Sequence, residues 1–165
     1  MERELTSLAR QSPACTELLT IPGIGLLTAT AMVAATGGSV SHFKDARHFA
    51  SWFGLTPKEF SSGHTRKLGR ISKKGDRYLR MLLPHGARAI LQAAELARRS
   101  GKALDGLRTW ATEIQARTHH NKAACALANK LARVCYSVLR DHTPYGNPPP
   151  RQEKKLTRTA FAIAA

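Results

Sequence analysis

The chain has 165 residues and a strongly basic composition. That length suits one domain with its own core, because domains of about 100 to 150 residues are the commonest, and it leaves no room for a second full domain. Lys and Arg number 26 against 11 Asp and Glu, which gives a formal net charge of +15. Such an excess predicts a nucleic-acid partner, with a basic ribosomal protein or a membrane-surface binder as alternatives.

The cysteines and the N-terminus predict a soluble cytoplasmic protein. Cys15, Cys125 and Cys135 lie in apolar helical patterns without metal-ligand spacing, which is typical of small buried side chains in a reducing compartment. His119 and His120 precede Cys125, but this spacing matches no zinc pattern. The first ten residues, MERELTSLAR, form no apolar signal region, and no apolar run approaches the roughly 18 residues of a membrane span.

Besides a polar helix at the N-terminus, the first half of the chain predicts three helices and a loop. Residues 1–12 form a polar helix that stops at Ser12-Pro13. Residues 14–36 read as an apolar helix, a tight turn and an Ala-rich helix. A third short helix covers 45–53, DARHFASWF, and 55–69 is a loop or an extended hairpin because it has no helical period.

The second half predicts three more helices and a disordered tail. After Gly75 one apolar stripe contains Leu79, Leu82, Leu83, Ala87, Ile90, Leu91 and Ala94. Pro84 should kink or break this helix, and Gly101 should end it. Helices follow at 104–117 and 121–140, the latter with Ala124, Leu127, Ala128, Leu131, Val134, Cys135 and Val138 inward. The class is therefore all-α, a compact helical domain, and 143–165, with PYGNPPPRQEKK, should be disordered.

The turn Pro22-Gly23-Ile24-Gly25 has the pattern of a helix-hairpin-helix element, which binds DNA without reading its sequence. Small residues let the backbone approach a phosphate, and N–H groups at the start of the next helix point at the anion. Thr28 would add a hydroxyl contact. An ordinary corner between two helices, requiring two glycines for its shape, is the structural alternative.

A basic segment follows the loop and should contact a phosphate backbone. Its cations are Arg66, Lys67, Arg70, Lys73, Lys74, Arg77 and Arg80. Arginines bind phosphates through two parallel hydrogen bonds. A solvated helix face, the usual reading of a charge run, fits less well because few acids accompany these cations.

Ser61, Ser62 and Gly63 precede those cations, with His64 next. A serine hydroxyl is a weak nucleophile unless a base or metal activates it and positive groups stabilise the attacked phosphate. The cations are present, but the residues alone identify no base, and His64 reads as a phosphate contact or a spectator. From the residues alone, a turn or a hydrogen bond to phosphate is favoured over catalysis for these serines, and Gly63 and His64 are counted among the expected DNA-binding residues.

Four runs together resemble the C-terminal transposase domain of bacterial DEDD-type insertion-sequence transposases, the bridge-RNA-guided recombinases related to site-specific DNA invertases. They are LLTIPGIGLLTATAMVAATG, FKDARHFASWFGLTPKEFSSG, RISKKGDRYLRMLLPHGARA and NKLARVCYSVLRDHTPY, covering about Cys15 to Tyr145. The resemblance implies that Ser62, in the SG pair after GLTP, attacks a DNA phosphodiester. The same resemblance implies that Ser62 then forms a covalent phosphoserine link to the DNA, which lets the cut strand be rejoined to a new partner.

Full members of that family begin with a RuvC-like domain, whose acidic tetrad binds divalent metal, and a helical linker. Asp45, Asp76, Asp105 and Asp141 are scattered along this chain and form no such tetrad. We therefore expect a linker remnant at 1–13, the transposase domain at 14–142, no cofactor in this chain, and Mg²⁺ only in the missing domain. Expected partners are DNA, a guide RNA, further copies or a RuvC-like chain, and no membrane. A truncated or split transposase is thus the main interpretation, with a non-catalytic nucleic-acid binder or an RNA chaperone as alternatives.

Overall fold

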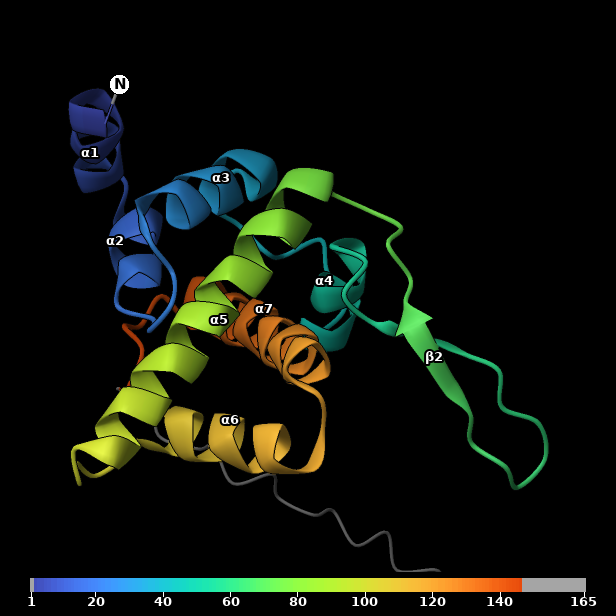
Figure 1. The fold of residues 1–165 in the computed structure, drawn as a ribbon. Coiled ribbons are helices and arrows are strands. Elements are labelled where there is room, and N and C mark those ends of the chain that lie inside the picture. Colours follow the sequence, from blue (N-terminus) through green and yellow to red (C-terminus); the bar gives the residue numbers. More distant parts are fainter. Residues whose placement is uncertain (1, 147–165) are drawn as a thin grey trace, which may run out of the picture.

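The structure is a computed structural model, and it describes residues 2–146 (Figure 1). Within that range it forms seven helices and one two-stranded antiparallel sheet. The helices are α1 Glu2–Gln11, α2 Pro13–Leu19, α3 Leu26–Thr36, α4 Ala46–Trp52, α5 Arg77–Arg99, α6 Gly106–Arg117 and α7 His120–Asp141, and the strands are β1 Pro57–Glu59 and β2 Leu68–Ile71. The predicted helical class is confirmed, and residues 55–69 include the hairpin that was one of the two predicted forms.

The core lies between α5 and α7, with α4, α2 and α6 packed around α7. Residues 127, 128, 131, 132 and 135 of α7 have no exposed surface. The predicted α5 stripe is buried apart from Leu82, and the predicted α7 stripe apart from Val134, both of which are half-buried. Each fully buried Leu of this kind contributes about 1.5–3 kcal/mol relative to leaving it exposed, so these two helices form a stable platform for the other elements.

Aspartates at helix starts serve as caps. The Asp45 carboxylate accepts the backbone N–H groups of Arg47 and His48, both at 2.8 Å. Asp76 and Asp105 cap α5 and α6 in the same way, each with one bond of 2.7 Å. A cap of this kind contributes about 1 kcal/mol, so these dispersed acids have a structural role.

Pro84 lies inside α5 without breaking it, so the predicted break does not occur. Proline removes one helical hydrogen bond, which usually costs about 3 kcal/mol or more. Here Leu79 and Leu83 on one side of Pro84, and Ala87 and Ile90 on the other, are buried in the same core. Packing of both halves therefore holds the helix together across the missing bond.

The first residues of the predicted disordered tail, 143–146, have a defined conformation. Tyr145 packs against the core, and its backbone N–H donates to the Thr20 hydroxyl at 2.8 Å. The rest of the predicted tail, 147–165, lies outside the described residues. At the other end, α1 forms as predicted, but Leu8 is 60% exposed whereas Ala9 is buried.

Cys15 and Cys135 are buried and Cys125 is half-buried, and all three are free thiols. Burial raises the pKa of Cys135 to about 12. This agrees with the predicted role of small apolar side chains. Among residues 2–146, no helix is both long enough and apolar enough to span a membrane.

Candidate nucleic-acid interface

The β1–β2 hairpin projects from the helical body, and its tip carries the predicted serines (Figure 1). Pro57 pairs with Ile71 and Glu59 with Leu68, with an irregularity between these pairs. Beyond the strands, the N–H of Phe60 donates to the carbonyl of Lys67 at 2.8 Å. All side chains from 57 to 70 are exposed. The segment is thus a solvent-exposed arm.

The tip is a tight turn. Ser62 and Thr65 exchange two backbone hydrogen bonds of 3.1 Å, which leaves Gly63 and His64 at the turn itself. Gly63 has a φ of +54°, in the left-handed region that favours glycine. Gly63 therefore lies where the conformational freedom of glycine is used, and His64 is exposed beside it.

The two serines differ in their bonding. The Ser61 hydroxyl donates to the Glu59 carboxylate at 2.7 Å and accepts the N–H of Lys67 at 3.2 Å. It therefore helps to hold the hairpin. The Ser62 hydroxyl is exposed and makes no hydrogen bond within residues 2–146. Its lone pairs and its proton are free for a group from outside, and no base of the described residues is bonded to it.

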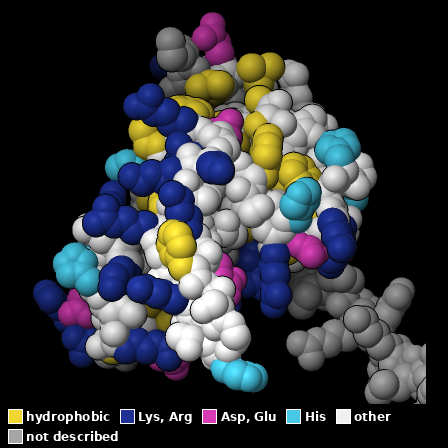
Figure 2. Space-filling view, turned by 90° about the vertical axis from the view of Figure 1, so that its right-hand side faces the viewer, with side chains coloured by type: hydrophobic (Ala, Val, Ile, Leu, Met, Phe, Trp, Pro, Cys, Tyr) yellow, Lys and Arg dark blue, Asp and Glu magenta, His cyan; other side chains and the backbone are white. Residues whose placement is uncertain are grey.

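Exposed cations surround this tip and continue to the start of α5. The exposed members of the predicted basic segment are Arg66, Lys67, Arg70, Lys73, Lys74 and Arg77. Arg66 lies 3.5 Å from Glu59, but its side chain is 73% exposed. Figure 2 looks onto the side from which the hairpin projects, and Lys and Arg side chains form a broad band over the left part of that face. A surface with this charge attracts a phosphate backbone.

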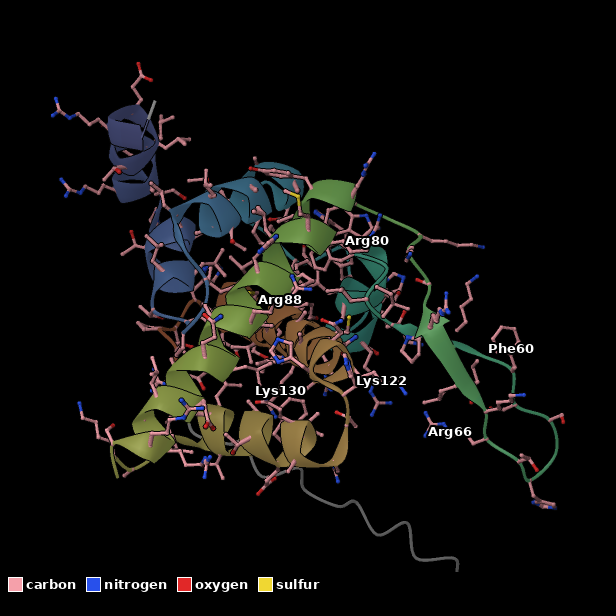
Figure 3. All side chains as sticks on the ribbon, viewed as in Figure 1. Phe60, Arg66, Arg80, Arg88, Lys122 and Lys130 are labelled. Carbon is pink, nitrogen blue, oxygen red and sulfur yellow. The ribbon has the colours of Figure 1, made fainter. Side chains whose placement is uncertain are left out.

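Arg80 differs from the other predicted cations. Its guanidinium donates to the backbone carbonyls of Gly75 at 3.1 Å and Phe53 at 3.3 Å. In Figure 3 it lies at the start of α5 against the helical body, whereas Arg66 lies on the hairpin. Arg80 therefore holds the base of the hairpin and has fewer donors left for a phosphate than its exposed neighbours.

Two glycines complete that base. A Cβ on Gly54 would lie 2.4 Å from the carbonyl oxygen of Lys74, and one on Gly75 only 1.8 Å from that of Trp52. Both glycines also have positive φ, +69° and +125°. The backbone before the hairpin thus lies directly on the backbone after it, which fixes where the arm leaves the body.

The predicted turn Pro22–Gly25 does join two helices, α2 and α3. A Cβ on Gly23 would lie 2.8 Å from the carbonyl oxygen of Gly86 and 2.7 Å from the Ile90 side chain, so this glycine packs against α5. Gly25 is exposed at the N-cap of α3, with open space around it and no side-chain cap. The corner alternative thus accounts for Gly23, while Gly25 and the uncapped α3 start face solvent. Pro22, which precedes Gly23, is half-buried.

Thr28 lies in the first turn of α3 and is only 6% exposed. Little of its side chain is therefore available to a phosphate. The described residues contain no group of three or more His, Cys, Asp or Glu side chains that could hold a metal ion. Asp45, Asp76 and Asp105 cap three different helices, as described above, and Asp141 is the last residue of α7.

Sequence reasoning missed an aromatic side chain at the hairpin. Phe60 is 63% exposed, and its ring lies across Gly69 on the opposite strand, where a Cβ would be 2.8 Å from it. Figure 3 shows Phe60 on the projecting arm near Arg66. A glycine opposite an apolar residue in an otherwise polar loop was the available signal. Of the other aromatic side chains near the hairpin and the start of α5, Trp52 packs on the core and Tyr78 is half-exposed.

Comparison with known proteins gives the family. The model of the IS116/IS110/IS902 transposase family matches residues 15–102. A probable family 20 transposase of Pseudomonas aeruginosa and the transposase of insertion sequence element IS1328 of Yersinia enterocolitica are each 39% identical to the chain over 145 residues, 88% of it. The IS1111A transposase of Coxiella burnetii is 35% identical over 144 residues, 87% of the chain.

The match covers only part of each relative. The aligned region spans 41% of the length of the first two proteins and 38% of the third. It includes the Pro22–Gly25 turn, the hairpin with its serines, and the whole of α5. The chain belongs to the IS116/IS110/IS902 family of insertion-sequence transposases.

Proposed function

We propose that this chain is the DNA-binding and nucleophile-bearing part of an insertion-sequence transposase, and that Ser62 is the nucleophile. The observation that carries the proposal is the contrast between the two serines. The Ser61 hydroxyl forms hydrogen bonds within the hairpin, whereas Ser62 presents a free hydroxyl at the tip of an exposed arm. Exposed cations lie on both sides of that tip, where negative charge would build on an attacked phosphate.

In the proposed reaction the Ser62 Oγ gives up its proton and bonds to the phosphorus of one DNA phosphodiester. The bond from phosphorus to one sugar oxygen breaks, and that oxygen takes a proton. The phosphoserine ester keeps the energy of the broken linkage, so a hydroxyl of another strand can attack it, restore a phosphodiester and free the serine. No step consumes a nucleoside triphosphate.

The chain's own residues would bind and position the DNA in this scheme. Gly63, His64, Arg66, Lys67 and Arg70 lie along the arm and would contact the backbone on either side of the cut. Lys73, Lys74 and Arg77 continue that contact toward α5, and Gly25 marks a second, smaller contact at the α2–α3 turn. The exposed Gly25 and the uncapped start of α3 are the part of that turn best placed for a phosphate.

Activation of Ser62 requires a group that residues 2–146 do not bond to it. We propose that a RuvC-like domain, outside this sequence or on a partner chain, supplies divalent metal such as Mg²⁺ for this purpose. A guide RNA and further copies of the chain would complete the assembly. The family's association with DNA transposition agrees with this division of labour.

A second candidate function is binding without catalysis. The absence of a bonded base at Ser62 in the described residues favours it, since an unactivated serine is a poor nucleophile. In that case the arm would hold a DNA or RNA backbone regardless of sequence, and Ser62 would only donate a hydrogen bond to a phosphate.

The two functions are separated by a covalent-adduct assay. The chain is mixed with the RuvC-like domain of a full-length relative, a guide RNA, Mg²⁺ and a nicked duplex, and the products are run on a denaturing gel. The nucleophile proposal expects a DNA–protein adduct that disappears in Ser62→Ala and persists in Ser61→Ala. Binding to duplex DNA should be retained by both variants, because neither loses a positive charge.

The full-length relative serves as the positive control. If it forms an adduct under conditions where this chain with its complementing domain forms none, the nucleophile proposal is wrong and the binding function remains. An adduct that survives in Ser62→Ala but disappears in Ser61→Ala would place the nucleophile on the other serine.

A further inference from the structure

A second basic surface lies away from the hairpin, between α4 and α7. Two adjoining clefts of about 480 and 350 Å³ share Ala46 and Arg133 in their linings. We call them together the α4–α7 groove. Its cations are Lys44, Arg47, Lys130, Arg133 and Arg140, and its acids are Asp45 and Asp141.

The two acids are already occupied. Asp45 caps α4 through two backbone N–H groups, which lowers its pKa. Asp141 accepts two hydrogen bonds from Arg140, at 2.7 and 2.8 Å, and this pairing lowers its pKa as well. Both carboxylates therefore stay ionised but leave most of the groove's positive charge uncompensated.

Three of the cations have no acidic partner in the part of the chain that the structure describes. They are Lys44, Arg47 and Arg133, and all three are exposed. Among the described residues none of them forms an ion pair within 4 Å, and Asp45 is the one acid whose pKa the charges of Lys44 and Arg47 help to lower. Lys130 lies 4.3 Å from the centre of the Trp110 ring, which positions its ammonium group at the groove without neutralising it. Like charges gathered in a concave surface repel each other, and the arrangement is most favourable when an anion lies between them.

The groove is separate from the arm. It lies at the N-terminal end of α4, whereas the hairpin is joined to the C-terminal end through Gly54. A helix of seven residues is about 10 Å long, so the start of the groove and the base of the hairpin are at opposite ends of α4, about that distance apart. Figure 1 shows the hairpin projecting away from α4 and α7.

The chain's own continuation does not have the charge to fill the groove. Residues 143–146 line one of the clefts, and the sequence that follows contains Arg151, Lys154, Lys155 and Arg158 against Glu153. This segment is basic like the groove. An anionic occupant must therefore come from another molecule.

We propose that the α4–α7 groove binds the phosphate backbone of a second segment of duplex DNA while the hairpin holds the first. The inference rests on the proposed function, because strand exchange requires two duplexes to be held together. Arginine forks match phosphate geometry, and the clefts are sized for the phosphates of one strand, with the rest of the duplex outside.

The test is a two-duplex capture assay with the whole chain. A short duplex is fixed to beads, the protein is bound to it, and a fluorescent duplex of unrelated sequence is added in solution. The groove variant is Arg47→Ala/Arg133→Ala, in which both residues are exposed and unpaired, so folding should be unaffected. The matched control is Arg98→Ala/Arg99→Ala, which also removes two positive charges, but at the C-terminal end of α5.

The groove variant should still bind the first duplex but lose capture of the fluorescent one, and the control should retain both. Affinity for the second duplex should fall with rising salt for both proteins. The slope of log affinity against log salt should be steeper for the wild type than for the variant by about 1.8, because the variant loses two phosphate contacts of about 0.9 each. Capture that the groove variant retains in full would overturn the proposal, since the second duplex would then be held by the hairpin of another copy.

Two further outcomes are informative. If a fluorescent RNA of equal length is captured through the groove and duplex DNA is not, the assignment to DNA is overturned. If the wild type fails to bind even the first duplex, the proposed function fails, and this result is distinct from loss of the second capture alone.

Discussion

The contact between Gly23 and Gly86 joins the α2–α3 turn to α5, and it predicts that Gly86→Ala destabilises the protein. In an ordinary helix this change is favourable by about 0.5–1 kcal/mol, because alanine restricts the unfolded chain. Here the new Cβ would lie 2.0 Å from the carbonyl oxygen of Gly23, which is backbone and cannot rotate away. The turn or α5 would have to move by about 1 Å to reach the 3.0 Å below which real contacts of this kind are essentially absent.

Forcing extra atoms into a packed interior typically costs about 1–3 kcal/mol. After subtracting the helix preference, we expect a net loss of roughly 1–2 kcal/mol in the free energy of unfolding. For a chain of this size that is a fall in Tm of roughly 2 to 8 °C. Thermal unfolding followed by circular dichroism, with urea unfolding alongside, measures it.

Gly106→Ala is the matched control, since Gly106 is also helical but a Cβ there would meet nothing within 4 Å. The Tm of the Gly106→Ala variant should equal or exceed that of the wild type. The packing argument is refuted if Gly86→Ala is as stable as the wild type or gains stability as Gly106→Ala does, because helix preference alone would then decide both positions.

Two further predictions concern titratable groups. At pH 8 a thiol reagent should leave Cys135 of the folded protein unmodified and should modify it after unfolding. A pKa of about 12, against a usual 9.0, lowers the thiolate population of Cys135 about a thousandfold. Rapid modification of Cys135 in the folded chain would contradict its burial. Hydrogen bonds from two arginines one turn later lower the pKa of Glu95 to about 2 from 4.5, so its stabilising contribution is present above about pH 4.5 and is lost as the pH falls toward 2. Urea unfolding of the wild type and of Glu95→Gln should therefore differ at pH 6 and converge near pH 2, and a difference that is constant with pH would argue against the ion pairs.

Local signals were enough to predict most of the helices. Apolar spacing located α5 and α7, and Asp45 and Gly101 marked ends that the structure places close to the predicted positions. Such signals work because caps and helical periodicity depend on residues within one or two turns. Pro84 shows their limit: the local cost of proline is real, but burial on both sides of it decides the outcome.

The candidate site was less predictable because its roles depend on residues far apart in the sequence. Gly23 and Gly86 are 63 positions apart, and nothing around either one indicates that their backbones meet. Arg80 reads in the sequence as one more cation of the basic segment, yet its guanidinium reaches the carbonyl of Phe53, 27 positions earlier. The α4–α7 groove likewise joins cations from two helices whose sequences show no unusual charge run.

These long-range contacts explain how a thin hairpin could present a nucleophile reproducibly. An isolated two-stranded hairpin is only marginally stable in water, so its own bonds cannot fix the position of Ser62 relative to the body. The backbone contacts of Gly54 and Gly75 and the Arg80 hydrogen bonds provide that connection at the base. The Ser61 bridge between Glu59 and Lys67 then stiffens the arm just before its tip. Positioning of the free serine is therefore supplied by residues that form their bonds and backbone contacts within the protein, which is why residues of the same type, Ser61 and Ser62 or Arg77 and Arg80, take different roles.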